Sequence, residues 1–179
     1  LNNEIALPKD LVNKNDEISL DPVSEDKIAW EAEDISFEVI FENKDYLIIN
    51  KPFNLVMHPG AGCNHGTLAN GLLFYYPELK TIPRAGIVHR LDKDTSGILL
   101  VARTERFRNY FVQLLQERKV KKLYKAVVVG KTIGSFEISE PIGRDRNNRT
   151  KISIRSDGKE ALTFVKLNES LNNYSLLDV

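Results

Sequence analysis

I-V-H-R-L-D-K-D-T-S, at residues 87–96, is the stretch that most constrains how this sequence folds. The apolar run of residues 97–101 follows it directly and predicts a buried β-strand. The stretch itself therefore forms a turn at the start of that strand. The polar side chains of interest in this turn are His89, Arg90, Asp92 and Asp94. Charged groups beside a buried strand are costly unless each has a partner or a task, so this turn is the first candidate for chemistry.

Outward from this turn, the hydrophobic pattern predicts more strands than helices. Strands are expected at residues 37–42, 46–49, 98–102, 123–129, 152–155, 162–167 and 174–179. Helices are expected over residues 68–76, with Thr67 as N-cap, and after Thr104, where an apolar stripe recurs at helical spacing. The turn residues 156–159 predict a hairpin between the strands that flank them. We therefore expect an α+β fold with a mixed, mainly antiparallel sheet and flanking helices.

Length and composition favour one main domain. With 179 residues, of which 42% are hydrophobic, the chain is long enough to bury one sizeable core. Its apolar runs are all shorter than the roughly 20 residues that a membrane span needs, so no membrane partner is expected. The single cysteine, Cys63, excludes an internal disulfide framework and fits a reducing compartment, which predicts a cytoplasmic protein.

The formal net charge of zero conceals a strong asymmetry. Residues 1–50 contain 13 acidic and 4 basic residues, whereas residues 51–179 contain 21 basic and 12 acidic residues. Residues 80–125, around the central turn, contain 12 basic residues against 4 acidic ones. A second basic cluster consists of Arg144, Arg146, Arg149, Lys151 and Arg155. Basic groups around a candidate site predict a polyanionic partner, and we expect the loop of the second cluster to contact nucleic acid. For Arg106, Arg108 and Arg118, a solvated helix face is the alternative.

Several ordered motifs resemble those of the RluA-type pseudouridine synthases. H-R-L-D-x-x-T-S-G is similar to the active-site signature of that family, and it places Asp92 at the catalytic aspartate. The other matching motifs are N-K-P-F-N-L-V-M-H-P-G (50–60), G-T-L-A-N (66–70), Y-Y-P-E-L (75–79), I-P-R-A-G (82–86), K-L-Y-K-A (122–126), P-I-G-R (141–144) and G-K-E-A-L-T (158–163). The H-P-G-A-G run most resembles the synthase D branch, which modifies large-subunit ribosomal RNA.

The resemblance implies the pseudouridine synthase catalytic fold and an isomerase that needs no cofactor and no metal. Asp92 would be the catalytic carboxylate, acting as nucleophile or as base. By the same resemblance, Arg90 displaces the target base and Tyr124 lies against it. Lys51, as a scaffold or a phosphate contact, and His89, as a hydrogen-bonded histidine, complete the expected substrate-binding set. The expected partner is RNA, large-subunit ribosomal RNA in particular, with no DNA partner, and the protein is expected to be a monomer.

Three segments are expected along the chain. Residues 1–22 are similar to the end of an S4-like RNA-binding domain, residues 23–36 form an acidic linker, and residues 37–179 form the catalytic domain. In the family, a G-R-x-H-Q-I-R segment follows the strand at 174–179, and its arginine pairs with the catalytic aspartate. This sequence ends before that segment. We therefore expect a catalytic domain truncated at its C-terminus, which by itself folds poorly and has little activity.

Two other functions fit part of the pattern. The D-K-D run at residues 92–94 permits the D-x-D metal site of a metal-dependent glycosyl-transfer enzyme, although the alternating strand–helix units of such enzymes are missing from the pattern. A catalytically idle RNA-binding module would keep the basic surface alone. His58, Cys63 and His65 do not have the repeated pair spacing of a zinc site, so structural or hydrogen-bonded histidines are predicted there, as for His89.

Overall fold

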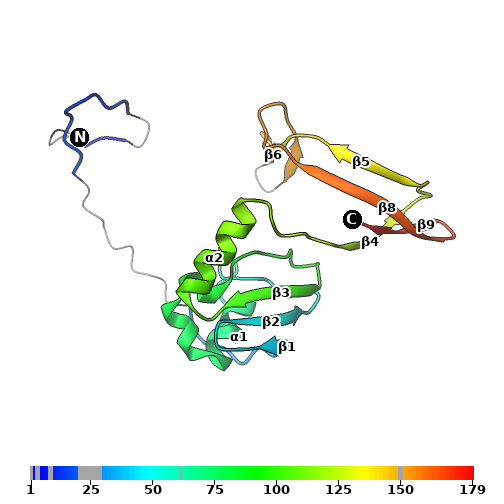
Figure 1. The fold of residues 1–179 in the computed structure, drawn as a ribbon, viewed down its shortest axis with the longest axis horizontal. Coiled ribbons are helices and arrows are strands. Elements are labelled where there is room, and N and C mark those ends of the chain that lie inside the picture. The colour runs from blue at the N-terminus through cyan, green and yellow to red at the C-terminus, as the bar shows by residue number, and fades with distance from the viewer. Residues whose placement is uncertain (1, 3–4, 8–9, 20–29, 61, 149–150) are drawn as a thin grey trace. The chain divides into compact units, whose positions relative to one another are not determined.

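Two segments of the chain form separate units, Leu1–Leu114 and Leu115–Val179. The computed structural model describes residues 2, 5–7, 10–19, 30–60, 62–148 and 151–179, and Figure 1 shows the order of their helices and strands. Every ladder between two strands in these residues is antiparallel, which confirms the predicted α+β fold with mainly antiparallel sheets. The first seven residues of the predicted linker, 23–29, lie outside the described residues.

The first unit is built on a three-stranded sheet in the order β1-β2-β3. Its strands are β1 (Glu38–Glu42), β2 (Tyr46–Lys51) and β3 (Gly97–Ala102). Successive side chains in a strand point to opposite faces, so Leu47, Ile49 and Lys51 share the buried face of β2. Leu47 is paired with Val101 of β3, and Ile49 with Leu99. The strand after the central turn is thus a buried strand, as predicted.

Helix α1 (Leu68–Tyr75) packs into the same core as the sheet. Thr67 is its N-cap, as predicted, and the backbone N–H of Thr67 donates to Oδ1 of Asn70 at 3.0 Å. Both residues are buried, so this pair satisfies polar groups that would otherwise be costly at the helix start. A short 3-10 helix, Pro77–Thr81, begins where proline prevents α1 from continuing.

Phe107 and Phe111 of helix α2 (Glu105–Gln116) contact aromatic rings of the first unit. The N–H of Phe107 donates to Oγ1 of Thr104 at 3.2 Å, which caps the helix. The Phe107 ring stacks on Tyr46 at 4.7 Å between centroids, and the Phe111 ring lies 6.3 Å from His89. These phenylalanines are only half-buried, so α2 is attached by ring contacts rather than by a closed core.

The second unit contains a four-stranded sheet in the order β4-β9-β8-β5 and a small two-stranded sheet. The four strands are β4 (Lys125–Val129), β9 (Tyr174–Asp178), β8 (Leu162–Leu171) and β5 (Ser135–Ser139). The small sheet pairs β6 (Ile142–Arg144) with β7 (Ile152–Ile154). Val165 and Leu177 are buried in this unit, while much of its apolar surface is exposed.

The predicted hairpin across residues 156–159 is wrong. β7 pairs with β6, and β8 pairs with β5 and β9 instead of with β7. Ile142 and Lys159 exchange two backbone hydrogen bonds, at 2.9 and 2.8 Å. Gly158 lies so close to Ile142 that an added Cβ would be 2.7 Å from its carbonyl. These contacts hold the turn against β6, so it does not fold β7 onto β8.

Candidate functional site

The buried side chain of Leu91 holds the turn that carries Asp92. Leu91 is 6% exposed and belongs to the core of the first unit, whereas the Asp92 side chain is 83% exposed. The N–H of Thr95 donates to the carbonyl of Asp92 at 3.1 Å and closes the turn. The alternation of buried leucine and exposed aspartate thus directs the carboxylate toward solvent while its backbone is held.

Arg90 lies beside this carboxylate. Its Nη2 is 3.5 Å from Oδ1 of Asp92, and the Arg90 side chain is 67% exposed. An ion pair in this much solvent contributes little to stability, so it restrains neither side chain strongly. The geometry leaves both groups accessible to a bound molecule.

Lys51 supports the turn from the buried side. Its side chain is 0% exposed, and Nζ donates to the carbonyls of Pro52 and Leu55, both at 2.9 Å, and of Lys93 at 3.2 Å. Burial lowers the pKa of Lys51, while the negative charges of Asp94 and Asp92 act in the opposite direction. An ammonium group has three donors, and all three are used here. This geometry favours the scaffold interpretation of Lys51 over the phosphate contact.

The histidines make structural contacts. Nε2 of His89 accepts the N–H of Leu100 in β3 at 3.0 Å, so the neutral ring carries its proton on Nδ1. Nδ1 of His65 lies 3.1 Å from Oε1 of Glu33. His58 stacks on Trp30 at 6.1 Å between ring centroids. These contacts confirm the prediction of hydrogen-bonded histidines at His89 and His65.

Residues 30–35 pack against α1 and the loop before it, within the first unit. The N–H of Glu33 donates to the carbonyl of Asn70 at 3.1 Å, and Oε2 of Glu33 accepts the N–H of Gly66 at 3.0 Å. Nδ2 of Asn70 donates to the carbonyl of Glu31 at 2.7 Å. Trp30 is partly buried and packs against the core of the first unit. The acidic composition of the segment concealed these contacts, and Trp30 was the one signal in the sequence that pointed to them.

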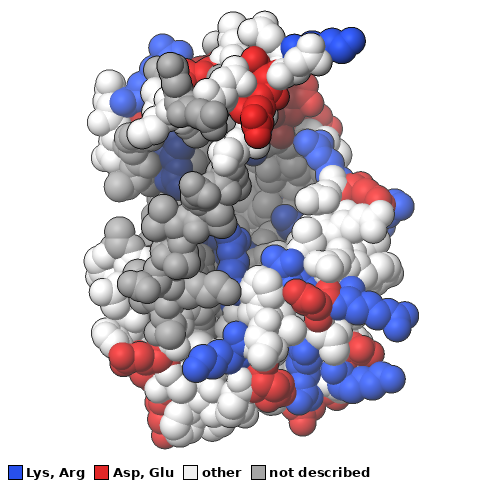
Figure 2. Space-filling model, turned by 90° about the vertical axis from the view of Figure 1, so that its left-hand side faces the viewer, with Lys and Arg blue, Asp and Glu red and all other residues white. Residues whose placement is uncertain are grey.

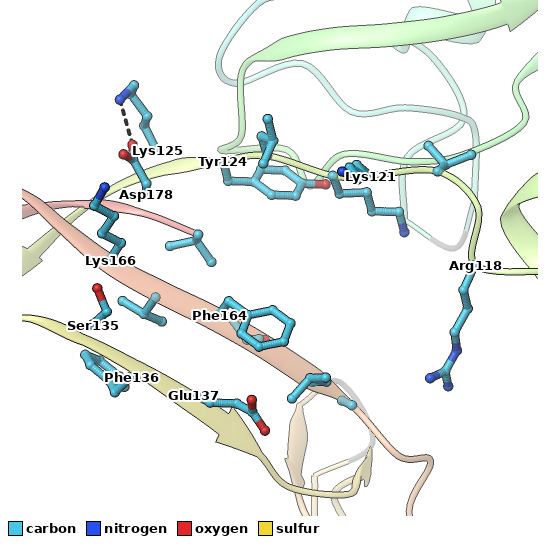
Figure 3. A pocket seen from close by; sticks show the side chains of 18 of the residues that line it. Arg118, Lys121, Tyr124, Lys125, Ser135, Phe136, Glu137, Phe164, Lys166 and Asp178 are labelled. Carbon is cyan, nitrogen blue, oxygen red and sulfur yellow. Dashed lines mark hydrogen bonds and ion pairs between the residues drawn. The ribbon is translucent and has the colours of Figure 1, made fainter.

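Tyr124 belongs to the second unit, whereas Lys51, His89, Arg90 and Asp92 belong to the first. Its N–H and carbonyl exchange hydrogen bonds with Val179, at 2.8 and 2.9 Å. Tyr124 lines an open groove of about 1570 Å³ in this unit, together with Phe136 and Phe164 (Figure 3). This volume exceeds the several hundred Å³ typical of a small-molecule pocket, so the groove is a broad surface rather than a closed cavity.

In the second basic cluster, the Arg155 side chain forms hydrogen bonds within the protein. Nε of Arg155 donates to Oδ1 of Asp157 at 2.8 Å, and Nη1 donates to the carbonyl of Arg144 at 2.5 Å. Nη2 of Arg146 lies 3.3 Å from Oδ2 of Asp157. Hydrogen bonds from Arg155 lower the pKa of Asp157. Arg155 therefore stabilises the β6–β7 hairpin. Arg149 of this cluster lies outside the described residues.

Charge is distributed in groups over the molecular surface. On the face drawn in Figure 2, Lys and Arg side chains project in several separate groups with Asp and Glu side chains between them. Within the described ranges, no three His, Cys, Asp or Glu side chains come together as a metal-binding group. Among the helices of the same ranges, none combines the length and apolar character that crossing a bilayer requires.

Comparisons with known proteins identify relatives of this chain. It is 39% identical over 171 residues to ribosomal large subunit pseudouridine synthase D of Vibrio parahaemolyticus, covering 96% of this chain and 53% of the relative. It is 41% identical over 170 residues to the protein of that name from Salmonella typhimurium, covering 95% of this chain and 52% of the relative. The chain thus spans about half the length of the curated relatives it matches.

The fold has solved counterparts, and the sequence matches a family. Human RNA pseudouridylate synthase domain containing 1 superposes with a TM-score of 0.62 at 24% identity, over 80% of this chain and 58% of that chain. Human RNA pseudouridylate synthase domain containing 4 gives 0.58 at 22% identity, over 79% and 57%. The model of the RNA pseudouridylate synthase family matches residues 45–179. Because this match covers most of the sequence, the chain belongs to the RNA pseudouridylate synthase family.

Proposed function

We propose that the protein containing this chain is an RNA pseudouridine synthase that isomerises specific uridines in large-subunit ribosomal RNA. The observation that carries the proposal is the Asp92 carboxylate, which is exposed on a turn that Leu91 and Lys51 hold in place. The names of the relatives and the 21 basic residues among positions 51–179 support an RNA substrate. We also propose that the protein is a monomer and acts in the cytoplasm.

The reaction exchanges one bond to the sugar for another. The bond between N1 of uracil and C1′ of ribose breaks, the base turns, and a bond between C5 and C1′ forms. C5 then loses its proton and N1 gains one, so atoms and electrons balance without any oxidant or imported group. Asp92 supplies the carboxylate at the sugar–base junction, as nucleophile at C1′ or as base.

A stacked uridine must leave its helix before a carboxylate reaches it, which costs a few kcal/mol. Arg90 is suited to compensate for this cost, because its planar guanidinium can occupy the vacated stack and bind phosphates. Its exposure and its weak ion pair with Asp92 leave it free to do so. From the match to the family motif, we propose Tyr124 as the aromatic residue that lies against the everted base.

The proposal is tested by mapping pseudouridines in ribosomal RNA from cells in which the chromosomal gene is deleted. We expect a small set of large-subunit positions to contain uridine in the deletion strain and pseudouridine again after the gene is restored. An unchanged map would refute the proposal. Isomerisation by the purified protein should also continue in excess chelator, whereas a metal-dependent glycosyl-transfer enzyme would lose activity.

A further inference from the structure

The side chain of His89 joins the Asp92 turn to the sheet. Its Nε2 atom accepts the backbone N–H of Leu100, with 3.0 Å between the two nitrogens. His89 lies three residues before Asp92, and Leu100 lies within β3. Strand β3 is at the edge of the three-stranded sheet, and the N–H groups of an edge strand need acceptors from outside the sheet. The imidazole nitrogen thus supplies an acceptor to this strand, as a carbonyl of a further strand would.

A row of aromatic rings fixes the imidazole of His89 from the side of α2. The His89 ring is half-buried and lies 6.3 Å from the Phe111 ring, between centroids. Phe111 stacks on Phe107 at 6.2 Å, and Phe107 stacks on Tyr46 of β2 at 4.7 Å. Contacts from two elements, β3 and α2, therefore hold the ring in the position from which Nε2 accepts its hydrogen bond.

The hydrogen bond to Leu100 exists only while the imidazole is neutral. Nε2 needs a free lone pair to accept an N–H, and a protonated ring carries a hydrogen on both nitrogens. An ordinary imidazole takes up a proton near pH 6.5. The contribution of this bond is therefore complete above about pH 6.5 and is lost as the pH falls below that value. The bond between the turn and β3 thus depends on pH in the range where histidines titrate.

Charged groups on the surrounding elements favour the neutral ring. Strand β3 contains no titratable side chain. Among the titratable residues of α2, Arg108 shares the side of the helix with Phe111, because it precedes it by one turn. Arg90 follows His89 directly and is paired with Asp92 at 3.5 Å. A positive charge on the imidazole would add to the positive charges of these two arginines.

We propose that His89 is a positioning residue, and that uptake of a proton by its ring releases the Asp92 turn from β3. This inference rests on the proposed function and adds a control by pH to it. Leu91 and Lys51 hold the turn at any pH near neutrality, whereas the contact of His89 is lost on acidification. A carboxylate that is no longer held at the sugar–base junction reacts more slowly, so kcat falls. RNA affinity does not depend on this contact.

The test compares the wild type with His89→Gln and His89→Leu, each purified as the whole protein from cells. Glutamine offers a carbonyl oxygen that accepts the Leu100 N–H at every pH, and leucine fills the space without an acceptor. The substrate is large-subunit ribosomal RNA from the deletion strain, labelled with tritium at C5 of uracil. Because C5 loses its proton in the reaction, release of tritium measures isomerisation.

We expect kcat of the wild type to fall about three- to tenfold between pH 7.5 and pH 5.5, with KM nearly unchanged. His89→Gln should keep most of its activity at pH 7.5 and show no such fall. His89→Leu should be about tenfold slower at pH 7.5 and equally insensitive to pH. His65→Gln, which removes an imidazole from the loop before α1, should keep the wild-type profile. The same fall in the wild type and in His89→Gln would overturn the proposal.

Hydrogen exchange separates this inference from the proposed function. The protection of the Leu100 amide, relative to its intrinsic exchange rate, should fall below about pH 6.5 in the wild type and stay constant in His89→Gln. If this is observed but no tritium is released at any pH, the isomerase proposal fails and the pH-dependent contact stands. If the wild type isomerises uridine while the protection of Leu100 is constant from pH 7.5 to pH 5.5, the positioning role fails and the isomerase proposal stands.

Discussion

The Nζ atom of Lys51 donates a hydrogen bond to the main-chain carbonyl of Lys93, at 3.2 Å, and so ties the end of β2 to the turn that carries Asp92. The same ammonium group also binds the carbonyls of Pro52 and Leu55. A buried cation therefore joins two loops that are about forty residues apart in the sequence. The position of the exposed aspartate depends on a residue that no substrate needs to touch.

Replacing Lys51 with Met should destabilise the first unit. Methionine fills a similar volume but leaves three buried carbonyls without their donor, so we expect a loss of about 2–4 kcal/mol in the free energy of unfolding. Urea unfolding measures this loss. Arg106→Met, at an exposed site on α2, is the control and should lie within about 0.5 kcal/mol of the wild type.

We also expect the difference in unfolding free energy between wild type and Lys51→Met to depend on pH. Because burial lowers the pKa of Lys51, the folded state binds fewer protons than the unfolded state between this pKa and the ordinary value of about 10.4. Stability contributed by this group therefore increases as the pH rises through that window. The difference in unfolding free energy between wild type and Lys51→Met should grow as the pH rises toward the ordinary value of about 10.4. A constant or shrinking difference would contradict this assignment.

Gly71→Ala should displace the segment of residues 30–35. Alanine in a helix is normally more favourable than glycine, but a Cβ at position 71 would be 2.6 Å from the carbonyl oxygen of Ile35. Trp30 is the one tryptophan in the sequence, so its fluorescence reports this displacement. We expect a red-shifted emission and a lower unfolding temperature. Gly60→Ala, whose Cβ would meet nothing within 4 Å, should leave both unchanged.

Asp157→Asn should loosen the β6–β7 hairpin. Arg155 and Arg146 lower the pKa of Asp157, so the stabilisation from its charge is present above the ordinary value of about 3.9 and is lost as the pH falls through the folded value. Hydrogen exchange at the Ile142 and Lys159 amides should be faster in the variant at pH 6 than in the wild type. Asp178→Asn, which removes an exposed partner of Lys125 in the larger sheet, should not change exchange at these two amides.

The sequence predicted the parts of the fold that local patterns determine. The apolar run after the Asp92 turn and the Thr67 cap each specify structure within a few residues, and each was confirmed. The hairpin across residues 156–159 failed because its outcome depends on Ile142, which is distant in sequence. The composition of a turn does not reveal which strands will pair with each other.

In the candidate site, too, the features set by a short segment could be predicted, whereas those set by tertiary packing could not. The motif located Asp92 and Arg90 on an accessible turn of the first unit, because their spacing in one short segment fixes their geometry. The three-carbonyl environment of Lys51 arises from tertiary packing around an isolated residue. A lysine in a sequence does not indicate whether it will be buried or exposed.

Asp92→Asn at the chromosomal gene tests the central claim most directly. The amide keeps the shape of the side chain and removes the charge that attack or proton transfer requires. RNA affinity of the purified variant should stay within about twofold of the wild type. Pseudouridine should be missing from the same large-subunit positions at which the deletion strain contains uridine. Retention of pseudouridine at these positions in cells carrying Asp92→Asn would contradict the account.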